Sequence, residues 1–180
     1  MRITENRRIA WVALALCVLI AVFGLGGAKL RGKYGDVKDY FLQGTDSSHS
    51  MEAYLGRCVR YANDLAYESR RYLEDEALSD NVLALSGKLD SVSGVSRERS
   101  ESYRDLTDAV ESLYSELQKA GASDETAVRQ AYQDYRSAVD LIRRDDYTEK
   151  AAAYHDIVSG FPANVIAKVW GISQTPRFGN

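Results

Sequence analysis

Few side chains in this sequence are arranged as a catalytic or metal-binding site requires. The two histidines, His49 and His155, lie in separate segments, and neither has a cysteine or carboxylate at the spacing of a zinc site. Asp145, Asp146 and Glu149 form an acidic cluster beside His155. Such a cluster suits either a weak cation site or a solvated helix face, and we expect the solvated face. We therefore predict no metal site.

The two cysteines, Cys17 and Cys58, do not form a disulfide framework, because Cys17 lies in an apolar segment and Cys58 on a predicted helix face. Cys58 is expected to be a small buried hydrophobe rather than a reactive thiol. The sequence contains no phosphate-binding loop, dinucleotide fingerprint, nucleophile elbow or HExxH motif. We expect a protein that is not an enzyme, with no catalytic residues and no cofactor.

The charges exclude a nucleic-acid partner. Residues 1–33 hold six basic residues against one acidic residue, a net charge of +5. The remainder carries 17 basic and 25 acidic residues, a net charge of −8, without a local basic patch. A domain of that sign does not attract a phosphate backbone.

An uncharged apolar segment begins at residue 9 and continues through residue 28. About 20 apolar residues suffice to cross the hydrocarbon core of a bilayer. After a short tail at 1–8 we predict a transmembrane signal anchor at residues 9–30, in contact with lipid through residues 9–28. A cleaved signal peptide, with cleavage near Gly26-Gly27-Ala28, is the alternative, and a buried soluble helix is a third. Basic residues flank both ends, so the side of the cell membrane that the domain faces stays open.

The remaining chain shows the periodicity of helices. Apolar residues recur at steps of three and four over residues 51–73, 97–119 and 124–159, with a bend or break near 145–146. Residues 78–95 predict a short helix and then a loop at 91–96. Residues 31–50 are expected to be a juxtamembrane connector with a short helix at 36–42, followed by N-cap candidates Asp46, Ser47, Ser48 and Ser50. The predicted fold is all-α: an N-terminal transmembrane helix and an antiparallel bundle of three to four long helices.

A distinctive stretch follows the last predicted helix. Pro162 keeps Phe161 out of helical geometry, and a short amphipathic helix is expected to start near Asn164. This turn either folds back and caps the bundle or supplies an aromatic patch for a partner. The candidate partner-contact residues are Phe161, Pro162, Asn164, Val165, Ile166, Val169 and Trp170.

The run YTEKAAAYHDIVSGFPAN at residues 147–164, with the apolar stretch VIAKVWG after it, resembles the C-terminal signature of the LemA family. The order of an N-terminal membrane segment and long antiparallel helices is similar too. Thr148, His155 and Ala163 depart from the family pattern, and its first-helix motif is reduced to RCVRYANDLA at residues 57–66.

The resemblance implies a LemA-like bundle at residues 51–171, a C-terminal tail at 172–180 and no catalytic residues. It also implies association with membrane peptidases or with surface and stress functions.

Two functional hypotheses follow. In the first, the bundle is a non-catalytic module that docks an unidentified protein partner, such as a membrane peptidase or an envelope component. In the second, it is an extracytoplasmic sensor or a small-ligand-binding helical domain. The sequence leaves the oligomeric state open.

Overall fold

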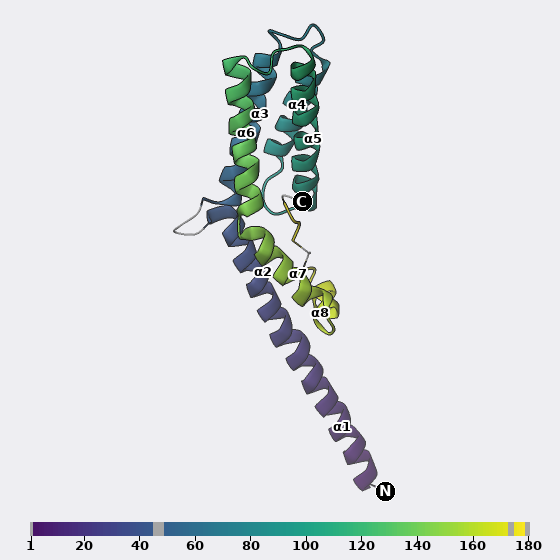
Figure 1. The fold of residues 1–180 in the computed structure, drawn as a ribbon. Coiled ribbons are helices and arrows are strands. Elements are labelled where there is room, and N and C mark those ends of the chain that lie inside the picture. Colours follow the sequence, from purple (N-terminus) through teal and green to yellow (C-terminus); the bar gives the residue numbers. More distant parts are fainter. Residues whose placement is uncertain (1, 45–48, 173–174, 179–180) are drawn as a thin grey trace. The chain divides into compact units, whose positions relative to one another are not determined.

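Helices account for most of the chain in the computed structural model, which describes residues 2–44, 49–172 and 175–178 (Figure 1). No strand occurs within these ranges, so the predicted all-α class is confirmed. The helices are α1 (Arg2–Ile20), α2 (Gly26–Gln43), α3 (Met51–Ser69), α4 (Ala77–Ser91), α5 (Arg97–Lys119), α6 (Thr126–Arg144), α7 (Tyr147–Ser159) and α8 (Ala163–Val169). A five-residue π-helical segment, η1 (Ala21–Leu25), joins α1 to α2.

The chain divides into two compact units. The first consists of Met1–Asp36 and Ala153–Gln174, and the second of Val37–Ala152 and Thr175–Asn180. The apolar helix and the predicted partner-contact turn belong to the first unit, and the bundle belongs to the second.

The second unit is built on a bundle of four helices, α3 to α6 (Figure 1). Helix α3 packs against the other three, and α4 also packs against α5. Short loops connect consecutive helices, so neighbours run antiparallel. The helix expected at 97–119 is confirmed as α5, whereas the short helix expected within 78–95 is α4, a full member of the bundle.

Helices α3, α5 and α6 bury most of the stripe that their sequence periodicity predicts, whereas α4 buries Val82 and Leu89 with two serines, Ser79 and Ser86. On α6, for example, the buried residues are Val128, Ala131, Tyr135, Ala138, Val139 and Ile142. Their spacing of three and four places them on one face, and the polar residues between them remain at the surface. The apolar side chains of four such stripes form the core of the bundle.

Local chemistry sets several helix ends. The Ser50 hydroxyl accepts a hydrogen bond from the Ala53 amide at 3.2 Å, which caps α3, and the other three N-cap candidates lie outside the described residues. Helix α3 ends at Ser69 rather than near 73, and the Ser69 and Ser79 hydroxyls lie 2.7 Å apart where α3 meets α4. Gly121, which follows the C-terminal end of α5, has a positive φ of 74°, the conformation that commonly ends a helix.

The predicted break near residues 145–146 is confirmed. Helix α6 ends at Arg144, and Asp145 has an extended conformation with ψ of 137°. The Asp145 carboxylate accepts a hydrogen bond from the Tyr147 amide at 2.8 Å, which starts α7 in a new direction.

Two segments expected to be a connector and a tail instead supply core residues. Helix α2 continues to Gln43, and Phe41 is fully buried; at the other end of the chain Phe178 is 1% exposed. The Phe41 ring lies 5.2 Å from Tyr147 and 5.5 Å from Phe178, and Tyr103 lies 6.1 Å from Phe178, measured between ring centroids. The second unit therefore closes on an aromatic cluster that the sequence pattern does not show.

A paired guanidinium lies against this cluster. The Arg99 side chain is only 6% exposed, donates to both carboxylate oxygens of Glu52 at 2.5 and 2.9 Å, and lies 5.5 Å from the Phe41 ring centroid. The bidentate geometry compensates the burial of the charge.

Candidate functional site

The candidate site is the turn that joins α7 to α8 in the first unit. Helix α7 ends at Ser159, and a cis Phe161-Pro162 peptide precedes α8. The Asn164 amide donates to the Gly160 carbonyl at 2.9 Å, which closes the turn. A short helix beginning next to Asn164 is confirmed as α8, Ala163–Val169.

The structure separates the predicted contact residues by exposure. Phe161 is 86% exposed, Val169 67%, Val165 40% and Trp170 39%, and Pro162 is exposed too. Ile166 is only 5% exposed, so its side chain is not available to a partner in this structure. Asn164 is half-buried, and its Oδ1 atom has no hydrogen-bond partner among the described residues.

Helical spacing explains the separation. Val165 and Val169 are four residues apart and share one side of α8, whereas Ile166 and Ala167 are buried on the other. The outer side of a short helix is thus apolar and uncovered, although its inner side already packs within the unit. We call Phe161, Val165 and Val169 the α8 patch.

The inner side of α8 packs on the segment where the apolar helix changes from η1 to α2. The Trp170 Nε1 group donates a hydrogen bond to the Phe23 carbonyl at 3.0 Å. A Cβ atom added to Gly27 would lie 2.1 Å from Trp170 Cε2, and one added to Gly26 would lie 3.0 Å from Ile166 Cδ1. The glycine pair, considered above as a cleavage site, is the surface on which Trp170 and Ile166 rest.

From Ile9 onward, helix α1 leaves its apolar side chains uncovered. Its apolar side chains are exposed by half or more: Ile9, Trp11, Val12, Leu14, Leu16, Val18, Leu19 and Ile20. The continuous helix from Ile9 to Gln43 contains a stretch that is long and apolar enough to cross a membrane, and none of the residues in that stretch is buried. A signal sequence meets the same criterion of length and composition.

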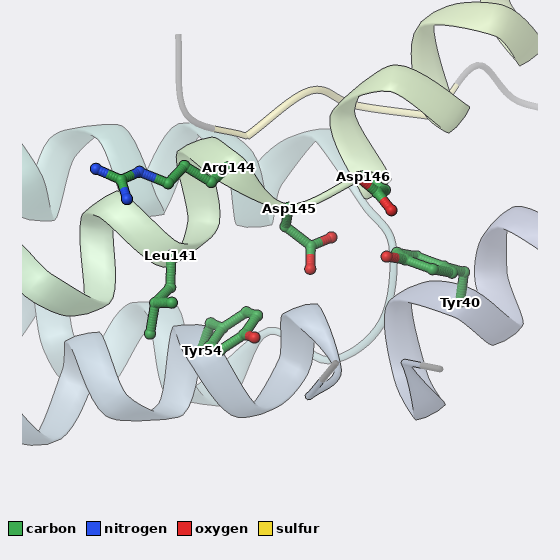
Figure 2. A pocket seen from close by; sticks show the side chains of 6 residues that line it. All are labelled: Tyr40, Tyr54, Leu141, Arg144, Asp145 and Asp146. Carbon is green, nitrogen blue, oxygen red and sulfur yellow. The ribbon is translucent and has the colours of Figure 1, made fainter. Parts of the chain in front are cut away.

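A second feature is a pocket of about 140 Å³ in the second unit (Figure 2). Its lining residues are Tyr40, Tyr54, Leu141, Arg144, Asp145 and Asp146. The Asp145 carboxylate points into it, with the Tyr40 and Tyr54 rings on either side (Figure 2). Burial raises the pKa of the Asp145 carboxyl above its usual range, although the hydrogen bond from the Tyr147 amide opposes the shift.

This pocket lacks the enclosure that is typical of a ligand-binding site. It is open to solvent, and Asp145 already has a structural partner in the Tyr147 amide. Pockets for drug-sized ligands are clefts or cavities of about 300–1,000 Å³. We treat it as a feature of the helix junction.

The remaining chemically interesting side chains are dispersed. Cys58 is fully buried, and burial raises the pKa of its thiol to about 12, which is the inert state expected from the sequence. The Nδ1 atom of His155 lies 3.8 Å from an Asp156 carboxylate oxygen at the surface, and His49 lies 6.0 Å from the Tyr54 ring. In the part of the chain that the structure describes, no three His, Cys, Asp or Glu side chains gather at metal-binding distances.

The sequence pattern predicts the turn before α8 but not the contact of α8 with Gly26 and Gly27. The available signal was the glycine pair at the end of the apolar run, because paired glycines in a helix allow another element to approach closely. Comparison with known proteins finds no matching family, no matching characterised protein and no matching solved structure.

Proposed function

We propose that this chain is a single-pass protein of the cell membrane, of the LemA type, whose helical bundle is a non-catalytic interaction or accessory module. The observation that carries the proposal is the contrast between the two units. The bundle buries most of its apolar stripes, whereas α1 leaves a helix of apolar side chains uncovered, with Val12 60% and Ile20 66% exposed. A surface of that kind in water is unfavourable at about 25 cal/mol per Å², and a bilayer removes the cost.

The dimensions agree with a membrane span. Residues 9–28 carry no charge, and a helix of that length extends about 30 Å, the thickness of the hydrocarbon core. Retention of the segment is supported by the contact of Trp170 with Phe23 and Gly27, because cleavage near residues 26–28 would remove the surface on which α8 rests.

The packed core and the exposed side chains of the bundle support an interaction role. Its core consists mainly of apolar side chains, and the second unit also has exposed large side chains such as Tyr67, which is 59% exposed, and Leu141, which is 40% exposed. Helical order, the N-terminal apolar helix and the turn before α8 are the features shared with the LemA pattern. A membrane peptidase or an envelope component is the class of partner that this resemblance implies. A small-ligand sensor, the alternative function, requires a polar pocket between the helices.

Membrane anchoring is tested by fractionation of the full-length protein. Wild type is expected to stay with membranes after alkaline carbonate extraction and to retain its N-terminal residues by intact mass. Replacing Leu16 and Val18, both 53% exposed, by lysine costs about 5–7 kcal/mol at the centre of a span and should shift the protein to the soluble fraction. A Ser112→Lys and Ser115→Lys pair on the exposed side of α5 is the matched control and should remain membrane-bound.

Two experiments in intact cells test which side of the membrane the bundle faces and whether the bundle binds a protein partner. Protease access to a C-terminal tag, before and after lysis, assigns the compartment that the bundle faces. A photo-crosslinking amino acid at Tyr67 or Leu141 should then form a discrete adduct with one protein of that compartment. Extraction of wild type by carbonate contradicts the anchor, and the lack of any adduct across growth conditions contradicts the docking role.

A further inference from the structure

We propose that α8 is an interfacial helix whose patch, Phe161, Val165 and Val169, inserts into the lipid bilayer at the boundary between hydrocarbon and headgroups. The inference rests on the membrane anchoring proposed above. It assigns lipid, rather than a protein partner, as the occupant of the exposed turn.

The depth of α8 follows from its contact with the span. Trp170 Nε1 donates to the carbonyl of Phe23, and Trp170 packs on Gly27. Phe23 lies five residues before Ala28, where the uncharged run ends. Five helical residues correspond to about 7.5 Å, so Trp170 contacts the helix about 7.5 Å from the end of that run. With residues 9–28 spanning the hydrocarbon core, α8 is held against the last turns of the span, at the level where acyl chains meet headgroups.

The outward side of α8 is suited to that level. Phe161 is 86% exposed, Val169 67% and Val165 40%, although their neighbours Ile166 and Ala167 are buried. Moving these uncovered apolar side chains from water into the acyl-chain region is favourable in proportion to the apolar area that leaves water. Trp170 adds an indole, the side chain that is enriched at membrane interfaces.

The charges around the patch match the headgroup layer. Lys29, Arg31 and Lys33 follow the apolar run and are exposed, and Lys168 is exposed on α8 itself. Basic side chains at this position attract anionic headgroups. Acidic Asp36 and Asp156 are also exposed in this unit, so its charge is mixed and the apolar patch is the main determinant.

Lipid is favoured over a protein partner because α8 rests on a segment of the span whose other apolar side chains are exposed. Leu25 is 74% and Val22 39% exposed on the same segment that α8 contacts. A soluble partner would have to cover the patch at a level where lipid already surrounds the neighbouring side chains.

The test uses site-directed spin labels in the full-length protein. Cys17 is replaced by alanine, and Cys58 is kept because it is fully buried. Single cysteines at Val165 or Val169 are labelled with a nitroxide, and the protein is placed in vesicles of phosphatidylcholine with phosphatidylglycerol as the minor lipid. Collision rates with oxygen, which concentrates in hydrocarbon, and with a water-soluble nickel chelate then report depth. Circular dichroism checks that each labelled protein keeps its helix content.

Two reference labels separate this inference from the proposed function. Val12 in α1 reports the span, and Ser115, an exposed residue of α5, reports water. We expect labels at Val165 and Val169 to favour oxygen over nickel, with a depth between those of the two references.

Three results would overturn the inference. Nickel access equal to that at Ser115, with Val12 in hydrocarbon, would leave the anchor intact and place α8 in water. Exclusion of both reagents from Val165 and Val169 would show that a second copy of the chain covers the patch. Nickel access at Val12 would remove the anchor and the interfacial helix together.

Discussion

The close contact between Trp170 and the glycine pair can be tested by one substitution. Gly27→Ala would place a Cβ atom 2.1 Å from Trp170 Cε2 and 2.2 Å from Nε1, a separation that no packed side chain tolerates. The indole must move, and its hydrogen bond to the Phe23 carbonyl is expected to break. The variant therefore separates α8 from the apolar helix while changing one methyl group.

The magnitude follows from the surface that Trp170 covers. The residue is 39% exposed, so about three fifths of its area is covered. With about 200 Å² for the whole side chain, the covered area is worth at most about 3 kcal/mol. The hydrogen bond adds about 0.5–1.5 kcal/mol, and the helix preference of alanine over glycine returns about 1 kcal/mol. Partial repacking leaves an expected loss of about 1–3 kcal/mol.

The assay is hydrogen exchange of the α8 amides, supported by Trp170 emission in a Trp11→Phe background. A loss of that size should accelerate exchange by about 5- to 150-fold. Gly24→Ala is the matched control, because a Cβ atom there meets nothing within 4 Å. Equal exchange rates in the Gly27 and Gly24 variants would refute the packing of Trp170 on this helix.

Three further predictions concern the second unit, each measured by denaturation in detergent micelles. Phe178→Ala should lower the free energy of unfolding by about 3–5 kcal/mol, because it removes a buried ring from the aromatic cluster. The control Arg177→Ala, at an exposed residue, should change it by less than about 0.5 kcal/mol. Equal effects of the two substitutions would show that the C-terminal segment does not pack on the second unit. Glu52→Ala should lower the free energy of unfolding by about 2–5 kcal/mol, because it leaves the buried Arg99 guanidinium without its carboxylate partner. The control Glu101→Ala breaks the exposed pair with Arg97 and should lower it by at most about 1 kcal/mol. A loss for Glu52→Ala as small as that of the control would contradict the burial of the Arg99 charge. The folded-state pKa of Asp145 is raised, so its ionisation destabilises the fold as pH rises above about 4. Asp145→Asn, which keeps an acceptor oxygen, should thus be more stable than wild type at neutral pH with the gain vanishing in acid, and a pH-independent difference would contradict this.

Much of the helical structure was predictable because it depends on local pattern. Residues 97–119 form the expected helix, since an uninterrupted stripe at steps of three and four lies between Ser96 and Gly121, which stop it at both ends. The break near residue 145 was predictable for the same reason, because the phase of the stripe changes there. Short helix α8 was predicted as well, because Pro162 ends one helix and apolar spacing begins another.

Contacts between residues far apart in the chain were not predictable. Phe178 lies in a short polar segment that reads as a tail, yet it packs between Phe41 and Tyr103. Nothing near Phe178 in the sequence identifies those partners, because periodicity reports which face of an element is apolar and not what covers it. The same limit explains why Phe41 was placed in a connector.

The elements of this protein follow from its sequence: an uncharged run long enough to span a bilayer, amphipathic helices that must pack together, and an apolar turn after the last long helix. These depend on composition and spacing within a few turns of chain. The packing of Trp170 and Ile166 on the glycine pair, which leaves Phe161, Val165 and Val169 exposed, is visible in the folded chain alone. That division depends on a contact between residues 147 positions apart, and a non-local contact leaves no periodic trace in the sequence.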